Sequence, residues 1–319
     1  MFLVFGVGRM FGSVTRLRAA AIIAALLICL SGVGLSFCAV HSAETVTVTG
    51  KDTDGEPTDR ADSGGTNTEE KTELCIVMYH GLVKDRSRQN RYMIDPQIFE
   101  NDLKYLTENG YHTITASELV AHFKNGTPLP DKPVMLTFDD GYYNNYLYAY
   151  PLLRRYNCSA VLSPIGKACA EAQNDLRQDP DYSQCTLSQI SEMSGSGYVE
   201  IAYHSYDLHS IGSGAQGVQK RAGESGAEYE KRLKEDIGSF MDCMSGVSDG
   251  IVCFTYPYGA KSAETEAVVR AAGFECAMDC EEKMNHLRSA EDLFSLHRFL
   301  RDGETSSEDF FGARIKSLP

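Results

Sequence analysis

The sequence contains no tryptophan and no basic stripe of the kind that follows a nucleic-acid backbone. Lys and Arg number 30 against 44 Asp and Glu, which gives a formal charge of -14 over 319 residues. This balance argues against nucleic acid as a partner. Without tryptophan, an aromatic platform for a sugar ring would have to use Tyr or Phe. Hydrophobic residues at 43% and charged residues at 23% are ordinary for a globular protein, so a wholly disordered or fibrous chain is excluded.

Two other short motifs are missing from the places where they would matter. No C-x-x-C pair is present, which disfavours a zinc site built from thiolates. No G-x-G-x-x-G follows the first expected strand, which argues against a nucleotide cofactor. Cysteines are nevertheless frequent, and Cys169 with Cys185, which flank a polar insertion, are the first pair to test for a disulfide.

The N-terminus carries a long apolar run. Arg9, Arg16 and Arg18 precede the uncharged residues 19–40, which are long enough to span about 30 Å of hydrocarbon. Basic residues on this side predict that the N-terminus stays in the cytoplasm and that the rest is exported. Residues 1–42 are therefore expected to be a signal anchor, or a signal peptide cut near Ser42. The remainder would lie at the extracellular face of the cell membrane or be secreted.

Two further segments follow the apolar run. Residues 43–72 are rich in Thr, Asp, Glu and Gly and contain no aromatic residue. Such a segment buries too little apolar surface to offset its ordering entropy, so we expect a flexible linker. Residues 73–319 remain as the folded domain.

Short apolar runs alternate with helical patterns through this domain. Strands are expected at 75–79, 133–138, 160–165, 198–202, 251–256 and 295–300, and helices at 145–156, 187–193, 228–244, 264–272 and 307–315. Two more helices are expected after the caps Asp95-Pro96 and Thr115 to Glu118. Alternation of this kind predicts a parallel α/β sheet covered on both faces. A (β/α) barrel fits the length, with a doubly wound open sheet as the alternative.

Side chains with catalytic chemistry fall at the ends of the expected strands. Asp139 and Asp140 follow the strand at 133–138, where one carboxylate could hold a metal and its neighbour could take a proton from water. His204 and His209 follow the strand at 198–202, and in a turn both imidazoles can converge on one ion. Two imidazoles and one carboxylate form a metal set that leaves positions open for water and substrate.

The later strand ends carry further candidates. Tyr256-Pro-Tyr258-Gly259 is a turn that could aim the Tyr258 backbone N–H at a developing oxyanion. On the last expected strand, His297 is a candidate general acid and Arg298 beside it is a cation.

These motifs, in this order, resemble the polysaccharide deacetylases of carbohydrate esterase family four. The resemblance rests on Thr137-Phe-Asp-Asp-Gly141, on His204 and His209, and on Tyr256-Pro-Tyr-Gly259, and it covers roughly residues 74–318. It is closest to the exported Gram-positive branch, with Met78-Tyr-His80 on the first strand.

The resemblance implies a distorted (β/α)7-type barrel and one divalent metal, usually zinc, with cobalt or another divalent ion as the alternative. It implies that Asp139 is the catalytic base and that Asp140, His204 and His209 bind the metal. It also implies that Tyr258 supplies the oxyanion N–H.

The same resemblance places the substrate and the reaction. We expect His80, Tyr142 and Tyr256 to line the sugar site. The expected reaction removes N-acetyl groups from an N-acetylglucosamine polymer of the cell wall or extracellular matrix. An O-acetyl esterase acting on a polymer such as acetylated xylan, and a silent membrane-tethered sugar-binding domain, are the alternatives.

The chain departs from the family pattern at two places. Where much of the family has an arginine that steadies the catalytic base, this chain has Thr255. The fourth family motif is not recognisable in residues 273–280. We therefore expect Arg298 to orient Asp139 in place of the missing arginine.

Overall fold

The computed structural model describes residues 71–248 and 250–315. The expected membrane-targeting segment and nearly all of the expected linker lie outside the described residues. Within the described part, no helix combines the length and the apolar composition needed to cross a membrane. The described helices are α1 (Pro96–Glu108), α2 (Ala116–Asn125), α3 (Tyr150–Tyr156), α4 (Gly166–Glu171), α5 (Leu187–Gly195), α6 (Gly226–Met244), α7 (Thr265–Ala271) and α8 (Ser307–Ile315).

The described strands are short except for two. They are β1 (Thr72–Tyr79), β2 (Gly81–Leu82), β3 (Met93–Ile94), β4 (His112–Thr113), β5 (Pro133–Asp140), β6 (Ala160–Pro164), β7 (Val199–Ile201), β8 (Ile211–Gly212), β9 (Ala215–Gln216), β10 (Cys253–Thr255), β11 (Cys276–Met278), β12 (Asn285–Leu287) and β13 (Phe299–Leu300). Their alternation with helices confirms the α/β class expected from the sequence.

The helix boundaries follow from local capping. Asp95 accepts a hydrogen bond from the Gln97 N–H and precedes a proline at the first position of α1. Thr115 and Glu118 form a reciprocal capping box at the start of α2. Gly126 ends α2 with φ +68°, a left-handed conformation that costs glycine little. Both helices therefore begin where the sequence predicts.

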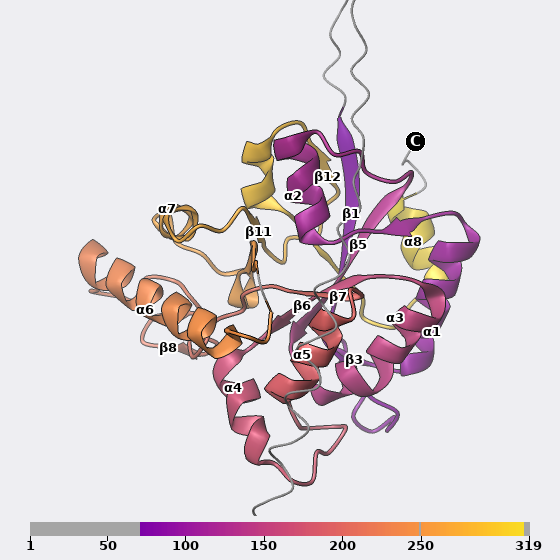
Figure 1. Cartoon of the computed structure of the whole chain (residues 1–319), viewed down its shortest axis with the longest axis horizontal. Coiled ribbons are helices and arrows are strands. Elements are labelled where there is room, and N and C mark those ends of the chain that lie inside the picture. Colours follow the sequence, from indigo (N-terminus) through magenta and orange to yellow (C-terminus); the bar gives the residue numbers. More distant parts are fainter. Residues whose placement is uncertain (1–70, 249, 316–319) are drawn as a thin grey trace, which may run out of the picture. The chain divides into compact units, whose positions relative to one another are not determined.

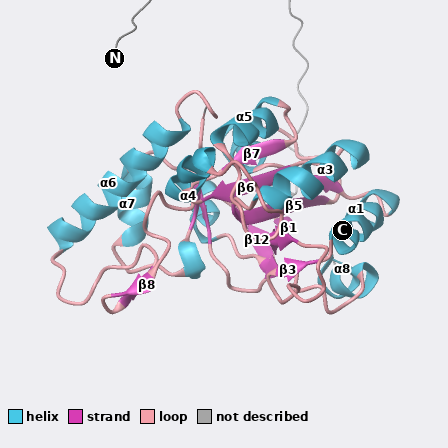
Figure 2. Ribbon diagram, turned by 90° about the horizontal axis from the view of Figure 1, so that it is seen from below, coloured by secondary structure: helices cyan, strands magenta, loops and turns pink. Residues whose placement is uncertain are grey.

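The core of the fold is a parallel ladder in which β1, β5, β6 and β7 lie side by side in that order. β13 pairs with the other edge of β1 in parallel, and β12 pairs with β1 antiparallel. Residues 134–140 of β5 are all buried, as expected of a central strand covered on both faces. Figures 1 and 2 place α1, α3 and α8 together on one side and α4, α6 and α7 on another.

β4 also pairs with β5 in parallel, and one further strand pair connects to the rest of the sheet through single bridges. β10 and β11 form a separate parallel pair. Tyr203 bridges to Phe254 of β10, and Met278 of β11 bridges to Leu296. The barrel itself stays a prediction, because only these isolated bridges join the two ladders.

The structure differs from the sequence expectations in detail. The strand expected at 295–300 is only Phe299–Leu300, and Ala290–Ser295 is a 3-10 helix. β11 and α4 have no counterpart among the expected elements. Cys169 and Cys185 are buried free thiols, so the structure does not contain the disulfide that was first to be tested.

Candidate active site

The C-terminal ends of the parallel strands surround a pocket of about 620 Å³. Its lining residues are Met78, His80, Asn90, Arg91, Tyr92, Met93, Asp139, Asp140, Tyr142, His204, His209, Gln216, Tyr258, Cys280, Glu282 and Leu300. A site at this edge is what parallel α/β sheets provide, because the carboxyl ends of their strands meet there. The pocket therefore collects most of the residues that the sequence singles out.

The end of β5 presents both aspartates to the pocket. Asp140 has φ +71°, a left-handed conformation that is rare for a residue with a side chain. Gly141 follows with φ +78°, and a Cβ there would lie only 2.8 Å from the Cβ of Pro164. The backbone turns sharply at this point, so a glycine is required directly after the two carboxylates.

Arg298 holds Asp139 in a buried bidentate ion pair. Its Nη1 lies 2.7 Å from Asp139 Oδ1, and its Nη2 lies 2.9 Å from Oδ2. Arg298 Nε donates to the carbonyl of Asp279 at 2.8 Å, and Nη1 also reaches Thr137 Oγ1 at 3.2 Å. Burial alone would raise the pKa of Asp139, but the Arg298 charge holds it well below its usual value. The structure thus places Arg298 on the residue that it was expected to orient.

Asp140, His204 and His209 converge as a possible metal-ligating set. Asp140 Oδ1 lies 3.6 Å from His204 Nε2 and 3.3 Å from His209 Nε2. This Oδ1 atom is buried and has no hydrogen-bond partner in the described part of the chain. An unpartnered buried carboxylate oxygen facing two imidazole nitrogens fits a divalent cation, which would satisfy all three atoms.

The protonation of the set also suits a metal. His204 Nδ1–H donates to the carbonyl of Thr255 at 3.0 Å, which leaves the Nε2 lone pair directed at Asp140. Burial lowers the pKa of His204 to about 3 and lowers that of His209 as well. Both imidazoles are therefore neutral, the form that ligates metals. Thr255 stands where the sequence comparison led us to look for an arginine, and its carbonyl orients His204.

Tyr258 lies at the rim of the pocket beside His209. Its φ is +61°, and its hydroxyl lies 3.2 Å from His209 Nδ1. The rings of the two residues lie 4.4 Å apart. Together with Asp140 and Ser205 (φ +75°), it is one of three non-glycine residues of the site in left-handed conformations. Such conformations cost about 1–3 kcal/mol each and concentrate at functional sites.

Asp236 of α6 holds the loop that carries both histidines, and the sequence analysis missed it. It is buried and accepts the backbone N–H groups of Tyr206 and Asp207, each at 2.8 Å. It also accepts the hydroxyl of Tyr203. The signal that could have revealed it is a carboxylate on the apolar stripe of an amphipathic helix.

We expect Asp236→Asn to weaken divalent-metal binding by about 10- to 100-fold, as is usual when a residue that supports metal ligands is lost. An asparagine side chain has only one acceptor atom, because its nitrogen donates. It therefore cannot accept the N–H groups of Tyr206 and Asp207 through two different atoms, and the loop between the histidines is held less firmly. Competition with a chromogenic chelator measures the affinity. Asp242→Asn, an exposed change on the same helix, is the control. Equal affinity in both variants would show that the loop holds its shape without Asp236.

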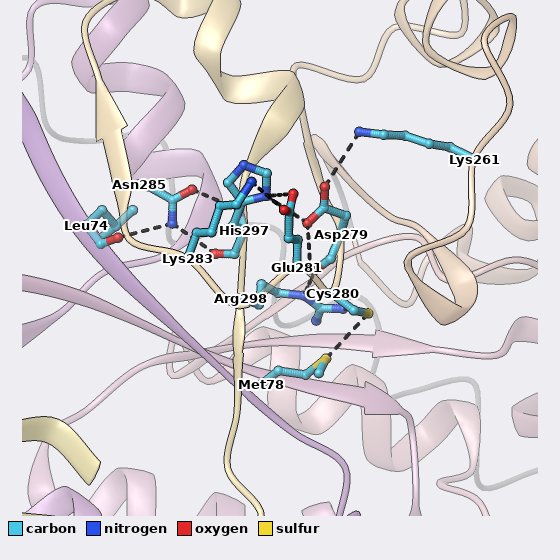
Figure 3. A network of polar contacts seen from close by, with 10 residues as sticks. All are labelled: Leu74, Met78, Lys261, Asp279, Cys280, Glu281, Lys283, Asn285, His297 and Arg298. Carbon is cyan, nitrogen blue, oxygen red and sulfur yellow. Dashed lines mark hydrogen bonds and ion pairs between the residues drawn. The ribbon is translucent and has the colours of Figure 1, made fainter. Parts of the chain in front are cut away.

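His297, expected as a general acid, does not reach the pocket. Arg298 points inward to Asp139, and the neighbouring side chain on an extended segment points the other way. Figure 3 shows the result: the His297 ring meets the carboxylate of Asp279, with Nδ1 3.0 Å from Oδ1. Asn285 brackets the His297 backbone, accepting its N–H at 2.8 Å and donating to its carbonyl at 2.9 Å. His297 therefore anchors the segment that carries Arg298, which corrects the expectation.

Of the three residues expected to line the sugar site, two line the pocket and one does not. His80 and Tyr142 line the pocket. Tyr256 does not, because it lies two residues after Phe254 and shares its face: the two rings pack 5.0 Å apart in the core. Tyr256 therefore lies in the core and not among the residues that line the pocket. His80 Nδ1 is buried without a hydrogen-bond partner among the described residues.

Comparisons with known proteins point to one family of enzymes. The family model for polysaccharide deacetylases matches residues 126–277. The chain is 27% identical over 258 residues to a poly-beta-1,6-N-acetyl-D-glucosamine N-deacetylase of Escherichia coli K12. That match covers 74% of this chain and only 38% of the relative's length.

Solved structures of the same class are similar. IcaB from Ammonifex degensii is 28% identical, with a TM-score of 0.59 over 72% of this chain and 91% of that one. A de-N-acetylase from Aggregatibacter actinomycetemcomitans has a TM-score of 0.63 over 74% of this chain and 97% of that one. At 24% identity, the latter likeness concerns the fold alone.

The parallel α/β fold brings two aspartates and two histidines together at its strand ends, and these are the residues on which the resemblance to the deacetylases rests. The family match and the structural likeness confirm the resemblance seen in the sequence. Residues 126–277 of the chain match the polysaccharide deacetylase family, and the chain is similar to members of that family.

Proposed function

We propose that the protein is a metal-dependent hydrolase that removes N-acetyl groups from a polymer containing N-acetylglucosamine. The observation that carries the proposal is the buried Asp140 Oδ1, unpartnered among the described residues and facing the two histidine nitrogens beside the Asp139–Arg298 pair. Relatives named as poly-beta-1,6-N-acetyl-D-glucosamine N-deacetylases support the substrate class.

A divalent cation held by Asp140, His204 and His209, for which we propose zinc, would acidify a water molecule and polarise the acetamide carbonyl. Asp139 would take a proton from the attacking water. Its carboxylate is ionised and its position is fixed by two hydrogen bonds from Arg298. The backbone N–H of Tyr258 would donate to the oxyanion that forms at the carbonyl, a contact typically worth about 3–4 kcal/mol.

His80 is the better candidate for the acid that protonates the departing amine. It lines the pocket, whereas His297 does not. Its Nδ1 has no partner in the described structure, and its ring packs against Tyr92 at 4.9 Å.

We expect His80→Gln to lower kcat by about 100-fold or more, within the range usual for a lost general acid, with KM less affected. His297→Gln should keep kcat near the wild-type value because that ring lies outside the pocket. Initial rates of acetate release across pH measure both variants. If His297→Gln were the inactive one, the roles of the two histidines would have to be exchanged.

The test of the proposed function is acetate release from N-acetylglucosamine oligomers by the full-length protein with added zinc or cobalt. We expect release that requires the metal and that is lost in Asp140→Ala, which removes the carboxylate of the metal set. Absence of release from folded, metal-loaded protein would contradict the proposal. Release from acetyl xylan alone would indicate an O-acetyl esterase, and oligosaccharide binding without release would indicate a sugar-binding domain.

We also propose that the protein is exported and acts at the extracellular face of the membrane or after secretion. The support is the arginine-flanked apolar run at 19–40 and the polar segment at 43–72. A distorted seven-stranded barrel is likewise our proposal for the closure of the fold. The bridges Tyr203 to Phe254 and Met278 to Leu296 support it.

A further inference from the structure

A basic segment borders the active-site pocket and has no place in the chemistry above. Residues 84–91 contain Lys84, Arg86, Arg88 and Arg91, here called the basic rim, and a single acidic residue, Asp85. All four basic side chains are exposed. Such a concentration stands out in a chain with a formal charge of -14. The segment continues into the pocket, whose wall includes the stretch 90–93.

Three of the four cations of the basic rim lie near tyrosine rings. Lys84 Nζ lies 4.6 Å from the ring centre of Tyr148, and the Arg88 guanidinium lies 3.9 Å from that of Tyr182. In the described part of the chain, no ion pair within 4 Å joins a rim cation to a carboxylate. A guanidinium that stacks on a ring keeps its in-plane N–H groups available for another partner.

Within the described residues, none of the three carboxylates that line the pocket forms an ion pair with the basic rim. Asp139 is paired with Arg298, and Asp140 faces the two histidines. Glu282 lies 4.0 Å from Arg314. Arg91 is thus a lining cation without an acidic partner among the described residues, and its guanidinium is available to an anion at the mouth of the pocket.

We propose that the basic rim binds anionic groups, phosphate or carboxylate, on the polysaccharide substrate. This inference rests on the proposed function and narrows its substrate class. Arginine forks bind both anions through paired hydrogen bonds. A neutral N-acetylglucosamine polymer becomes cationic as acetyl groups are removed, because each reaction exposes an amine that is protonated near neutral pH. The rim repels such a product, whereas an anionic polymer stays attracted.

The test compares three substrates of the full-length, metal-loaded protein by acetate release. They are neutral N-acetylglucosamine oligomers, peptide-free strands that carry muramic acid carboxylates, and oligomers that carry phosphodiesters. We expect kcat/KM to be about tenfold or more higher for at least one anionic substrate at low salt, within the range of electrostatic steering. Raising NaCl from about 0.05 M to about 0.3 M should shrink this preference, since salt screens exposed charges.

The double variant Arg88→Gln/Arg91→Gln should lose most of the preference, measured as the ratio of anionic to neutral kcat/KM. Arg155→Gln, an exposed arginine outside the pocket, should keep it, and thermal unfolding checks that both variants fold. The anionic substrate with the larger ratio shows whether the rim binds carboxylate or phosphate. Equal, salt-independent kcat/KM for all three substrates would overturn the inference and leave the deacetylase intact. Absence of acetate from every substrate would instead refute the proposed function.

Discussion

Replacing Asp139 with asparagine should reduce kcat by about 100- to 10,000-fold, the range for loss of a positioned general base, while the protein still binds its divalent metal. An amide cannot take the proton from water. The three proposed metal ligands are left in place, because Asp139 is not among them. Chelator competition and acetate release, measured on the same preparation, separate the two effects. A variant with a near-normal rate would show that Asp139 is not the base.

The same substitution strips Arg298 of its buried counter-charge. Removing one partner of a buried ion pair costs about 3–5 kcal/mol, so the variant should also be less stable. Asp102→Asn is a matched control, because Asp102 is equally buried and paired with Arg301, with Nε 3.0 Å from Oδ2. It should lose comparable stability and keep its activity at temperatures where it is folded. Loss of activity in both variants would point to instability as the common cause.

The sequence predicts much of the fold because its local signals agree with one another. Apolar runs mark the buried strands, and Asp95-Pro96 and the Thr115 to Glu118 box mark helix starts that the structure has at the same places. β11 escapes this reasoning because it has only three residues, too few to show a period. Its connection is also non-local, since it pairs with β10 across the α7 crossover.

His297 and Tyr256, both expected at the pocket, lie outside it for the same reason. Adjacent residues on an extended segment face opposite sides, so Arg298 and His297 cannot both face Asp139. The expectation that Arg298 reaches Asp139 already implied that His297 points away. Tyr256 likewise shares the face of Phe254, a core residue. The order of the motifs predicts that a residue lies at a strand end. The side that its side chain faces depends on the alternation of side-chain direction along the strand.

Asp279 and Asp236 support the site in ways that sequence motifs do not predict. Asp279 offers a backbone carbonyl to Arg298, and any residue type could supply that group. Asp236 accepts two backbone N–H groups from a loop about thirty residues earlier in the chain, a relation that only the fold creates. Both residues act on the site through other residues, so the spacing of catalytic motifs gives no sign of them.

Replacing Arg298 with methionine should lower kcat/KM at neutral pH by about 100-fold or more, because the catalytic base loses its ionised, fixed state. Burial then acts on Asp139 without compensation and raises the pKa of its carboxyl. The acid limb of the pH–rate profile should therefore move upward by about 1 to 3 pH units. An unmoved limb would show that Asp139 does not depend on Arg298 for its ionisation.

The stability of this variant should depend on pH in the opposite direction from the wild type. In the wild type the folded-state pKa of Asp139 lies below its unfolded value, so the ion pair stabilises the fold above that unfolded value and the contribution is lost as pH falls. In Arg298→Met the folded-state pKa is raised, so the buried carboxylate destabilises the fold at neutral pH and the penalty shrinks as pH falls. Urea unfolding at about pH 3 and at about pH 7, on either side of the unfolded aspartate pKa, measures the difference.

Arg298→Lys distinguishes charge from geometry. Lysine keeps a positive charge but replaces two parallel N–H donors by a single ammonium group, so Asp139 stays ionised while its orientation is less fixed. We expect the acid limb to stay near its wild-type position and kcat to fall less than in Arg298→Met. The partial rescue would mean that the charge keeps the base ionised and that the bidentate fork aims it. If the lysine variant were as inactive as the methionine variant, the loss of kcat would be due to the missing bidentate hydrogen bonds and not to the missing charge.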